Sequence, residues 1–389
     1  MISLSDVRRA LVPLTVAGLL LMGGTAAATV PAVAHRPGPA TCSLAGAELT
    51  ATARPAEDLT DLFTGYGDSG TGWTGADSTY SVRLRDGSLA WIFSDTFLGP
   101  VEADGTRPRT TPFLNNSIVL QEGDHLRTVT GGTAGAPESI VGPTADGDWH
   151  WFGAGVLTRR GDLTVGVLRF ARFGDGYWDW GWESNALVTL DTDTWQVTGL
   201  DPLPSAAGVQ WASWYQRAGG HVIVHGVEDL GAVKYMHVAM VVGGDLTDLR
   251  RWRYWDGQGW SRTETDSARV MPGVANEYSV SPYRDGYLLV TQDTSVPFGS
   301  EIRAYTSCSP TGPFEGGTTI YRMPEVGAWG SYGDPDVIAY NAHEHPELRD
   351  GDTLLVSYNV NSIDTDDVYD DVTIYRPRFI EVELDLTRP

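Results

Sequence analysis

The feature that most constrains the fold of this chain is a turn signal that recurs along most of its length. Glycine-containing pairs stand at Asp86-Gly87, Asp146-Gly147, Gly219-Gly220, Asp285-Gly286 and Asp350-Gly351, spaced 60, 73, 66 and 65 residues apart. Each pair is followed by a short apolar segment, such as LAWIFSD or YLLVTQD. A glycine pair flanked by alternating apolar residues is typical of a β-hairpin. A hairpin that returns at a nearly fixed period indicates one repeated structural unit.

Five such units, each with room for four strands, predict an all-β fold. We expect a five-bladed β-propeller with four-stranded antiparallel blades, occupying residues 61–389 as a single domain. One blade cannot bury both of its faces alone, so neighbouring blades must stack around an axis. The 14 tryptophans of the chain suit such packing. One two-sheet β-sandwich, or two of them, is the alternative, and the regular spacing favours the propeller.

The first residues have the pattern of an export signal. MISLSDVRR supplies positive charge, ALVPLTVAGLLLMGG is apolar but short for a membrane span, and small residues follow. We therefore assign residues 1–34 to a signal peptide, with a membrane anchor as the alternative. Residues 35–60 are rich in Ala, Pro and Thr and are predicted to form a flexible leader. The protein is expected to be secreted, without membrane insertion after cleavage.

Charge and cysteine content agree with an extracellular location. The formal net charge is −23, which argues against binding nucleic acid or anionic lipid through bulk electrostatics. Cys42 and Cys308 are the only cysteines. In an oxidising compartment they are expected to form a disulfide that ties the leader to the fourth unit. A monomer is expected.

Acidic residues recur at the open ends of the hairpins. If all blades share one orientation, residues about nine positions before and after each turn gather at one end of the ring. Those positions are occupied by Asp77, Asp95, Glu138, Glu228, Glu277, Asp293, His343 and Glu344. Clustered carboxyl groups acquire unlike pKa values, which suits general acid and base chemistry. The candidate catalytic residues are Asp77, Asp95, Glu138 and Glu277.

The first hairpin does not settle how its two acids are oriented. Pairing the apolar residues around the turn, with Tyr80 opposite Phe93, places Asp77 and Asp95 on opposite faces. A β-bulge would bring the two side chains together. The separation of the carboxyl groups therefore stays open. If the two acids cleaved a glycosidic bond, this separation would decide between inversion and retention of the anomeric configuration.

Several other residues are candidates for binding a substrate. Asn116 carries an amide suited to sugar hydroxyls, Trp211 and Tyr278 are candidate stacking platforms, and His343 and Glu344 lie in the run AHEHPEL. Capping or core roles are the alternatives. His343 and His345 lie two residues apart, but no third ligand stands at a diagnostic spacing, so we assign no metal site. A structural calcium ion held by oxygen atoms stays open. No cofactor is expected to be required.

Three stretches resemble a known family. YSVRLRDGSLAWIFSDTF with LNNSIVLQ, NEYSVSPYRDGYLLVTQ, and YNAHEHPELRDGDTLLVSYNVN are similar to the secreted bacterial family called domain of unknown function 4185. Part of that family is glycoside hydrolase family 183, five-bladed propellers that cleave D-arabinan internally. The resemblance covers roughly residues 60–386.

The resemblance implies roles for the acids. The paired acids of the family's first blade fall on Asp77 and Asp95, and we favour this pair. Related propeller glycosidases place a base in the first blade and an acid in a later one, which implies Asp77 as base and Glu138 or Glu277 as acid. The two assignments differ in the partner of Asp77.

Together these observations predict a secreted glycoside hydrolase. Its expected substrate is a furanose-containing cell-wall polysaccharide such as D-arabinan, cleaved by two carboxyl groups. A catalytically inert glycan-binding propeller is the first alternative. A cell-surface scaffold whose acidic mouth holds calcium is the second.

Overall fold

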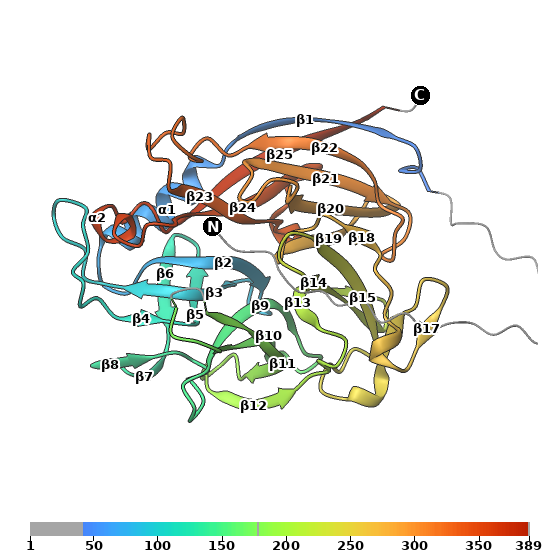
Figure 1. Cartoon of the computed structure of the whole chain (residues 1–389), viewed down its shortest axis with the longest axis horizontal. Coiled ribbons are helices and arrows are strands. Elements are labelled where there is room, and N and C mark those ends of the chain that lie inside the picture. Colours follow the sequence, from blue (N-terminus) through green and yellow to red (C-terminus); the bar gives the residue numbers. More distant parts are fainter. Residues whose placement is uncertain (1–41, 177–178, 388–389) are drawn as a thin grey trace, which may run out of the picture. The chain divides into compact units, whose positions relative to one another are not determined.

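The structure is a computed structural model that describes residues 42–176 and 179–387. Within them the chain forms five blades of antiparallel strands, whose innermost strands contact one another in a closed cycle (Figure 1). In cyclic order these strands are β2 (Trp73–Arg83), β9 (Trp149–Leu157), β13 (Val209–Ala218), β19 (Tyr278–Tyr283) and β23 (Val337–Glu344). A closed cycle of sheets excludes the two-sheet sandwich. The prediction of an all-β, five-bladed propeller is confirmed.

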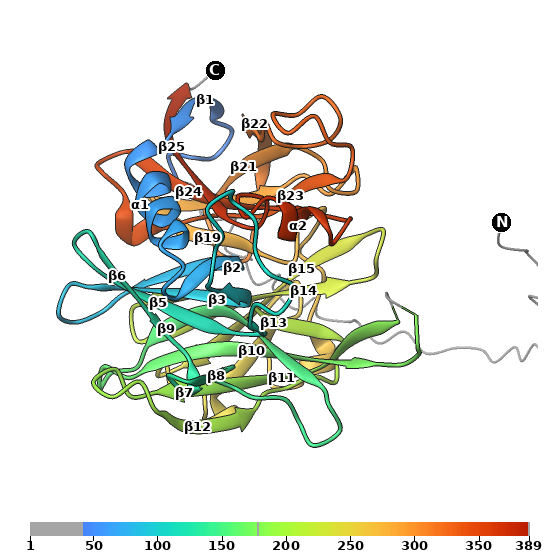
Figure 2. The same ribbon diagram turned by 90° about the vertical axis from the view of Figure 1, so that its left-hand side faces the viewer.

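In blades 1 and 2 the chain runs outward from the innermost strand. Blade 1 continues with β3 (Leu89–Leu98), β4 (Phe113–Leu114), β5 (Ser117–Glu122) and β6 (His125–Val129), followed by the small hairpin of β7 (Gly131–Thr133) and β8 (Ala136–Glu138). Blade 2 continues with β10 (Leu163–Arg172), β11 (Trp180–Leu190) and β12 (Val197–Pro202). Figure 2 shows β9 to β12 side by side in this order.

Blades 3 and 4 repeat the outward course. Blade 3 continues with β14 (His221–Asp229), β15 (Lys234–Val242), β16 (Trp252–Trp255), β17 (Trp260–Ser261) and β18 (Met271–Pro272), with the 3₁₀ helices η1 (Leu249–Arg251) and η2 (Glu264–Asp266) in its loops. Blade 4 continues with β20 (Gly286–Gln292), β21 (Glu301–Ser307) and β22 (Glu315–Arg322).

Blade 5 combines both ends of the described chain. Its remaining strands are β24 (Thr353–Ser362), β25 (Pro377–Thr387) and β1 (Glu48–Pro55), with the 3₁₀ helix η3 (Pro346–Leu348) before β24 and the short helix α2 (Asp367–Asp370) after it. β1 pairs with β25 along its whole length, from Glu48 opposite Thr387 to Pro55 opposite Ile380 (Figure 1). The N-terminal strand thereby joins the last blade and closes the ring.

The prediction of a flexible leader over 35–60 is wrong for the part that the structure describes. That part contains β1 and the start of helix α1 (Glu57–Asp68). Leu49 of β1 is buried. Phe63 of α1 packs edge-on against Trp73 and Trp91, with ring centroids 5.3 Å apart in both pairs. Strand pairing and aromatic packing therefore fix a segment whose composition suggested disorder. The predicted signal peptide, residues 1–34, lies outside the described residues.

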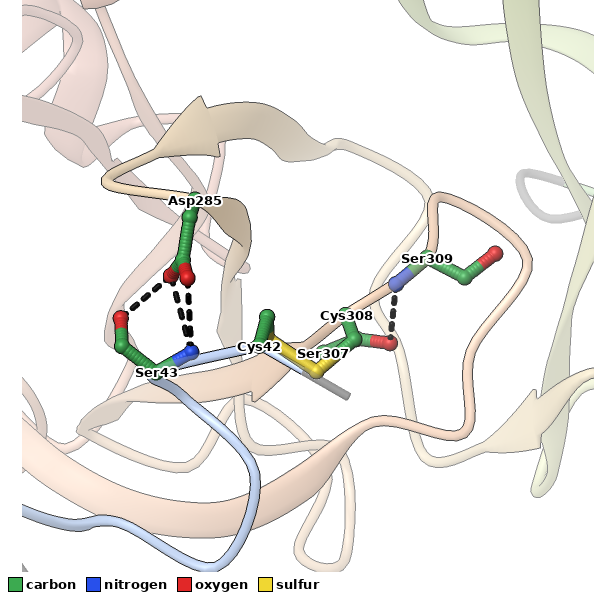
Figure 3. Close-up of a disulfide and its surroundings, with 6 residues drawn as sticks. All are labelled: Cys42, Ser43, Asp285, Ser307, Cys308 and Ser309. Carbon is green, nitrogen blue, oxygen red and sulfur yellow. Dashed lines mark hydrogen bonds between the residues drawn. A yellow bond between two sulfur atoms is a disulfide. The ribbon is translucent and has the colours of Figure 1, made fainter. Parts of the chain in front are cut away.

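The predicted disulfide is present. Cys42 and Cys308 are bonded across 266 residues of sequence (Figure 3). Beside the bond, the backbone amide of Ser43 donates to both carboxylate oxygens of Asp285, at 3.0 and 2.8 Å. Asp285 belongs to the turn of blade 4, so the leader is tied to the fourth unit as expected. Within the described residues, no helix has the length and apolarity that a membrane crossing requires.

One of the five predicted turns was misread. In blades 1, 3, 4 and 5 the predicted pair does join the two innermost strands. In blade 2, however, Asp146-Gly147 precedes β9, and the equivalent turn contains Gly161. Gly161 has a φ of 111°, a conformation that glycine adopts readily and other residues rarely do. The error shifts every position counted from that turn.

Candidate active site

A cavity of about 1640 Å³ opens at the end of the ring where the innermost strands begin. All five blades contribute to its lining. Examples in blade order are Asp77 and Asp95, Trp149, Gln210, Glu277 and Tyr340. The expectation that the open ends of the hairpins gather at one place is therefore confirmed. Three of the four candidate catalytic acids, Asp77, Asp95 and Glu277, lie in this lining.

Strand β2 is irregular next to Asp77, where it borders the cavity. The pairing of β2 with β3 shifts between Ala76 and Ser78 and again between Ser78 and Tyr80. Ser78 and Thr79 have φ values of 79° and 70°, which are unusual for residues with a side chain. The predicted register was one residue off, since Arg83 pairs with Leu89. In the observed register Ala76 pairs with Thr96, so Asp77 stands opposite Asp95 and the two side chains share a face, whereas the predicted register had put them on opposite faces.

Two tyrosines hold the carboxylate of Asp77. The hydroxyl of Tyr340 donates to Oδ1 at 2.5 Å, and that of Tyr375 donates to Oδ2 at 2.7 Å. Desolvation raises the pKa of Asp77 from 3.8 to about 6, and the two hydroxyl donors limit that rise. Both oxygens accept a hydrogen bond, which favours the ionised form. At neutral pH Asp77 is therefore mostly ionised and can accept a proton.

Asp95 lies close enough to Asp77 for the two charges to interact. Its Oδ1 accepts hydrogen bonds from the amide of Asn115 at 2.9 Å and from the indole of Trp151 at 2.7 Å. Desolvation, and then the negative charge of Asp77, raise the pKa of Asp95 from 3.8 to about 7. Like charges at close range disfavour each other's ionisation. The two acids of blade 1 therefore act as an interacting pair.

Glu277 approaches the same pair from blade 4. It directly precedes β19, and its Oε1 accepts a hydrogen bond from the hydroxyl of Ser78 at 2.8 Å. Its Oε2 has no hydrogen-bond partner among the described residues and is shielded from solvent. Desolvation raises the pKa of Glu277 well above 4.5, and the charge of Asp77 adds to this rise. Glu277 therefore keeps its proton to a higher pH than an ordinary glutamate does.

Glu138 does not belong to this site, contrary to the prediction. It lies on β8, opposite Gly131 in a small hairpin, is exposed, and does not line the cavity. The prediction counted from Asp146-Gly147, which is not the hairpin turn of blade 2. Glu228 is likewise outside the cavity, where it pairs with Arg269 at 2.6 Å. Asp293 does line the cavity, and Arg303 neutralises it at 2.8 Å.

Asn116 and Tyr278, two predicted substrate-binding residues, instead join blades. Asn116 is fully buried, and its amide group donates to the carbonyls of Val141 and His150 at 2.9 Å each. The hydroxyl of Tyr278 donates to the carbonyl of Gly226 at 2.9 Å. Because these polar groups are already paired at blade junctions, neither side chain reaches the cavity.

Trp211, His343 and Glu344 also lie behind the cavity lining. The indole of Trp211 donates to Glu264 at 2.9 Å, and its ring is fully buried. His343 stacks on Tyr80 with centroids 4.4 Å apart, and desolvation lowers its pKa to about 4. Glu344 forms a buried ion pair with Arg349. None of the five predicted substrate-binding residues therefore contacts the cavity.

Sequence reasoning missed a further polar cluster in the cavity lining, formed by Gln210, Asp229, Lys234 and Asn276. The ammonium of Lys234 contacts Asp229 at 2.7 Å, and Asn276 donates to the same carboxylate at 2.8 Å. Gln210 accepts a weaker hydrogen bond from Asn276 at 3.4 Å. Lys234 is the only lysine of the chain, a signal that the sequence offered. Among the described residues, no three His, Cys, Asp or Glu side chains converge as metal ligands would.

The fold and the cavity define the class of the protein, a five-bladed β-propeller with an acid-lined axial cavity. The chain belongs to the family described as domain of unknown function 5005, whose model matches residues 60–384. The family is not the one that the sequence motifs resemble, so that finer resemblance is not confirmed. No curated protein matches the chain.

Solved structures with similar folds include a Bacteroides ovatus protein described provisionally as a hydrolase. It is 18% identical, with a TM-score of 0.71, covering 88% of this chain and 95% of that one. At this identity the similarity shows the fold. A Podospora anserina α-L-arabinofuranosidase has a TM-score of 0.48 and 12% identity, over 81% of this chain and 93% of that one. A Dyadobacter fermentans protein of unknown function has a TM-score of 0.47 and 11% identity, over 81% and 96%. Scores below 0.5 carry no functional argument.

Proposed function

We propose that the protein is a secreted glycoside hydrolase that cleaves a furanose-containing polysaccharide such as D-arabinan. The observation that carries this proposal is the meeting of Asp77, Asp95 and Glu277 in one cavity, each in a different environment. Glycoside hydrolysis needs one carboxyl group that is protonated and one that is ionised. Unlike surroundings are how a protein keeps neighbouring carboxyl groups in those two states.

The environments favour Asp77 and Glu277 as the working pair. Glu277, whose pKa is raised well above 4.5, is the proton donor to the leaving glycosidic oxygen. Asp77, ionised above about pH 6, activates a water molecule or attacks the anomeric carbon. Asp95 adjoins Asp77 and modulates its charge. This pairing differs from the Asp77–Asp95 pair that the motifs of the first blade favour.

The choice of a furanose substrate rests on the motifs of blades 1, 4 and 5, which resemble D-arabinan-cleaving propellers. The predicted signal peptide and the Cys42–Cys308 disulfide support an extracellular location, where cell-wall polysaccharide is accessible. The proposed reaction uses only carboxyl groups and water, so it requires no cofactor. We expect the protein to act as a monomer.

The test is the release of reducing ends from D-arabinan by the wild type and by Asp77→Asn and Glu277→Gln. General acid or base catalysis contributes about 10²–10⁴-fold, so each variant should lose about that factor in kcat. Glu138→Gln is the matched control, because Glu138 is exposed outside the cavity, and it should behave as wild type. A nitrophenyl furanoside has a leaving group that needs no proton, so Glu277→Gln should lose far less activity on it.

Two results would reject the proposal. The first is product release at the wild-type rate by both Asp77→Asn and Glu277→Gln. The second is saturable binding of oligosaccharide by the wild type with no reducing-end release from any furanose polysaccharide. The second result would instead identify an inert glycan-binding propeller.

A further inference from the structure

One wall of the cavity is built from aromatic side chains of a single blade. Trp149 and Trp151 from β9, Phe170 from β10, and Trp180 and Trp182 from β11 all line the cavity. Phe170 pairs with Trp149 on one side and with Trp182 on the other, so the three stand in one row across the sheet. We call these five side chains the blade 2 aromatic wall.

Four rings of this wall, those of Trp149, Trp151, Phe170 and Trp180, contact one another. Trp149 and Phe170 are stacked, with centroids 6.1 Å apart and planes inclined by 17°. The ring centroid of Trp151 lies 4.3 Å from that of Phe170 and 5.3 Å from that of Trp180, which it meets edge-on. Apart from the Trp149–Phe170 pair, these rings are inclined to one another by 50–84°. Aromatic rings that line a cavity suit the apolar faces of sugar rings.

These tryptophans differ in exposure from those of the core. Trp73, Trp91 and Trp211 are 0% exposed. The four tryptophans of the aromatic wall are only partly buried. Core packing therefore does not account for the open surface of the wall.

The wall is physically continuous with the acids. The indole N–H of Trp151 donates to Oδ1 of Asp95 at 2.7 Å, so the wall begins at the carboxyl cluster. Trp149 lies two residues from Trp151, on the same face of β9. A sugar ring stacked on Trp149 would therefore belong to the same glycan chain as a sugar ring bound at the acids.

The charge of the cavity restricts which sugars fit. Seven carboxyl side chains line it, against two cationic ones among the described residues, Arg172 and Lys234. Arg303 and Arg169, which lie outside the lining, pair with Asp293 and Asp148 at 2.8 and 3.5 Å. Lys234 is already paired with Asp229 at 2.7 Å. An excess of negative charge disfavours an anionic ligand such as a uronate or a phosphorylated sugar.

We propose that the blade 2 aromatic wall is a stacking subsite for uncharged sugar rings of a glycan chain that extends from the acids. This inference rests on the proposed function, since it places the wall beside the bond to be cleaved. It assigns the site a neutral oligosaccharide as ligand.

The test measures binding of neutral arabino-, xylo- and cello-oligosaccharides, and of an oligo-uronate, by calorimetry in the Glu277→Gln background. Trp149→Ala should weaken binding of the preferred neutral series by about ten- to thirtyfold, the effect of removing a well-packed tryptophan anchor. Trp149→Phe keeps a ring and should retain most of the affinity. Trp255→Ala is the matched control, because Trp255 forms a partly exposed edge-on pair with Trp260 outside the cavity.

The outcomes separate the subsite from the hydrolase proposal. If the wild type cleaves a glycan while Trp149→Ala binds and cleaves it as Trp255→Ala does, the subsite is rejected and the hydrolase stands. If neutral oligosaccharides bind through Trp149 but no bond is cleaved by wild type, the hydrolase is rejected and the subsite stands. Equal affinity for oligo-uronate, or no binding of any neutral series, overturns the proposed ligand.

Discussion

Replacing Asp95 by asparagine should make the protein more stable at alkaline pH. Both hydrogen bonds to Asp95, from Asn115 and Trp151, end on Oδ1. Asparagine can keep that oxygen in place, so Asp95→Asn removes the charge and preserves both contacts. The variant therefore measures how much an ionised carboxylate at position 95, beside Asp77, lowers the unfolding free energy.

The magnitude follows from the pKa of Asp95. The folded-state pKa is raised from 3.8 to about 7, so the folded protein binds this proton more tightly than the unfolded chain. Its contribution to stability is complete below about pH 3.8 and is lost as the pH rises to about 7. A shift of about three pKa units corresponds to a ceiling of about 4 kcal/mol. Because the side chain stays partly open to the cavity, we expect about 2 kcal/mol.

The assay compares thermal midpoints of wild type and Asp95→Asn at pH 4 and pH 8. The variant should melt about 3–6 °C higher than wild type at pH 8 and at nearly the same temperature at pH 4. Asp86→Asn is the control, because donors from Ser88 lower the pKa of Asp86 and no stabilisation is expected there. A midpoint of Asp95→Asn that is unchanged or lowered at pH 8 would refute the reasoning.

Three further predictions concern the fold around the site. Cys42→Ser with Cys308→Ser opens a link across 266 residues and should lower the unfolding free energy by about 2–5 kcal/mol, measured in denaturant; an unchanged midpoint would show that β1 alone closes the ring. Glu344→Gln leaves the charge of Arg349 without its carboxylate partner and should lower the unfolding free energy by about 3–5 kcal/mol. Adding Arg349→Met should restore much of that stability, and the absence of any rescue would contradict the ion pair. Asn116→Ala removes the amide that donates to the carbonyls of Val141 and His150, and it should lower the unfolding free energy by about 1–3 kcal/mol without lowering kcat. A rise in KM alone would instead support the predicted role of Asn116 in substrate binding.

The fold was predictable because its signals are local and repeated. A turn pair between alternating apolar residues defines a hairpin, and its recurrence defines the ring. The same reasoning brought Asp77, Asp95 and Glu277 to one cavity, since each lies near an open end of a hairpin. Glu138 failed because Asp146-Gly147 was taken for the turn of blade 2. Counting from the true turn at Arg160-Gly161 leads instead to Trp151, which lines the cavity.

The partners of the acids were not predictable from the sequence. Tyr340 and Tyr375 lie 263 and 298 residues from Asp77, and only the closed ring brings them to its carboxylate. The choice of Trp211 over Trp149 failed for a related reason. Both are tryptophans at the start of an innermost strand, and only packing shows that one is covered by neighbours and the other is open. The alternating pairs in WHW and WGW were a signal that was passed over.

The most direct measurement is a crystal structure of Glu277→Gln bound to an oligosaccharide that the wild type cleaves. The catalytic assignment predicts a glycosidic oxygen within about 3 Å of the side chain at position 277, with the anomeric carbon facing Asp77. An oligosaccharide bound outside the cavity, or with its glycosidic oxygen beyond the reach of all three acids, would contradict it.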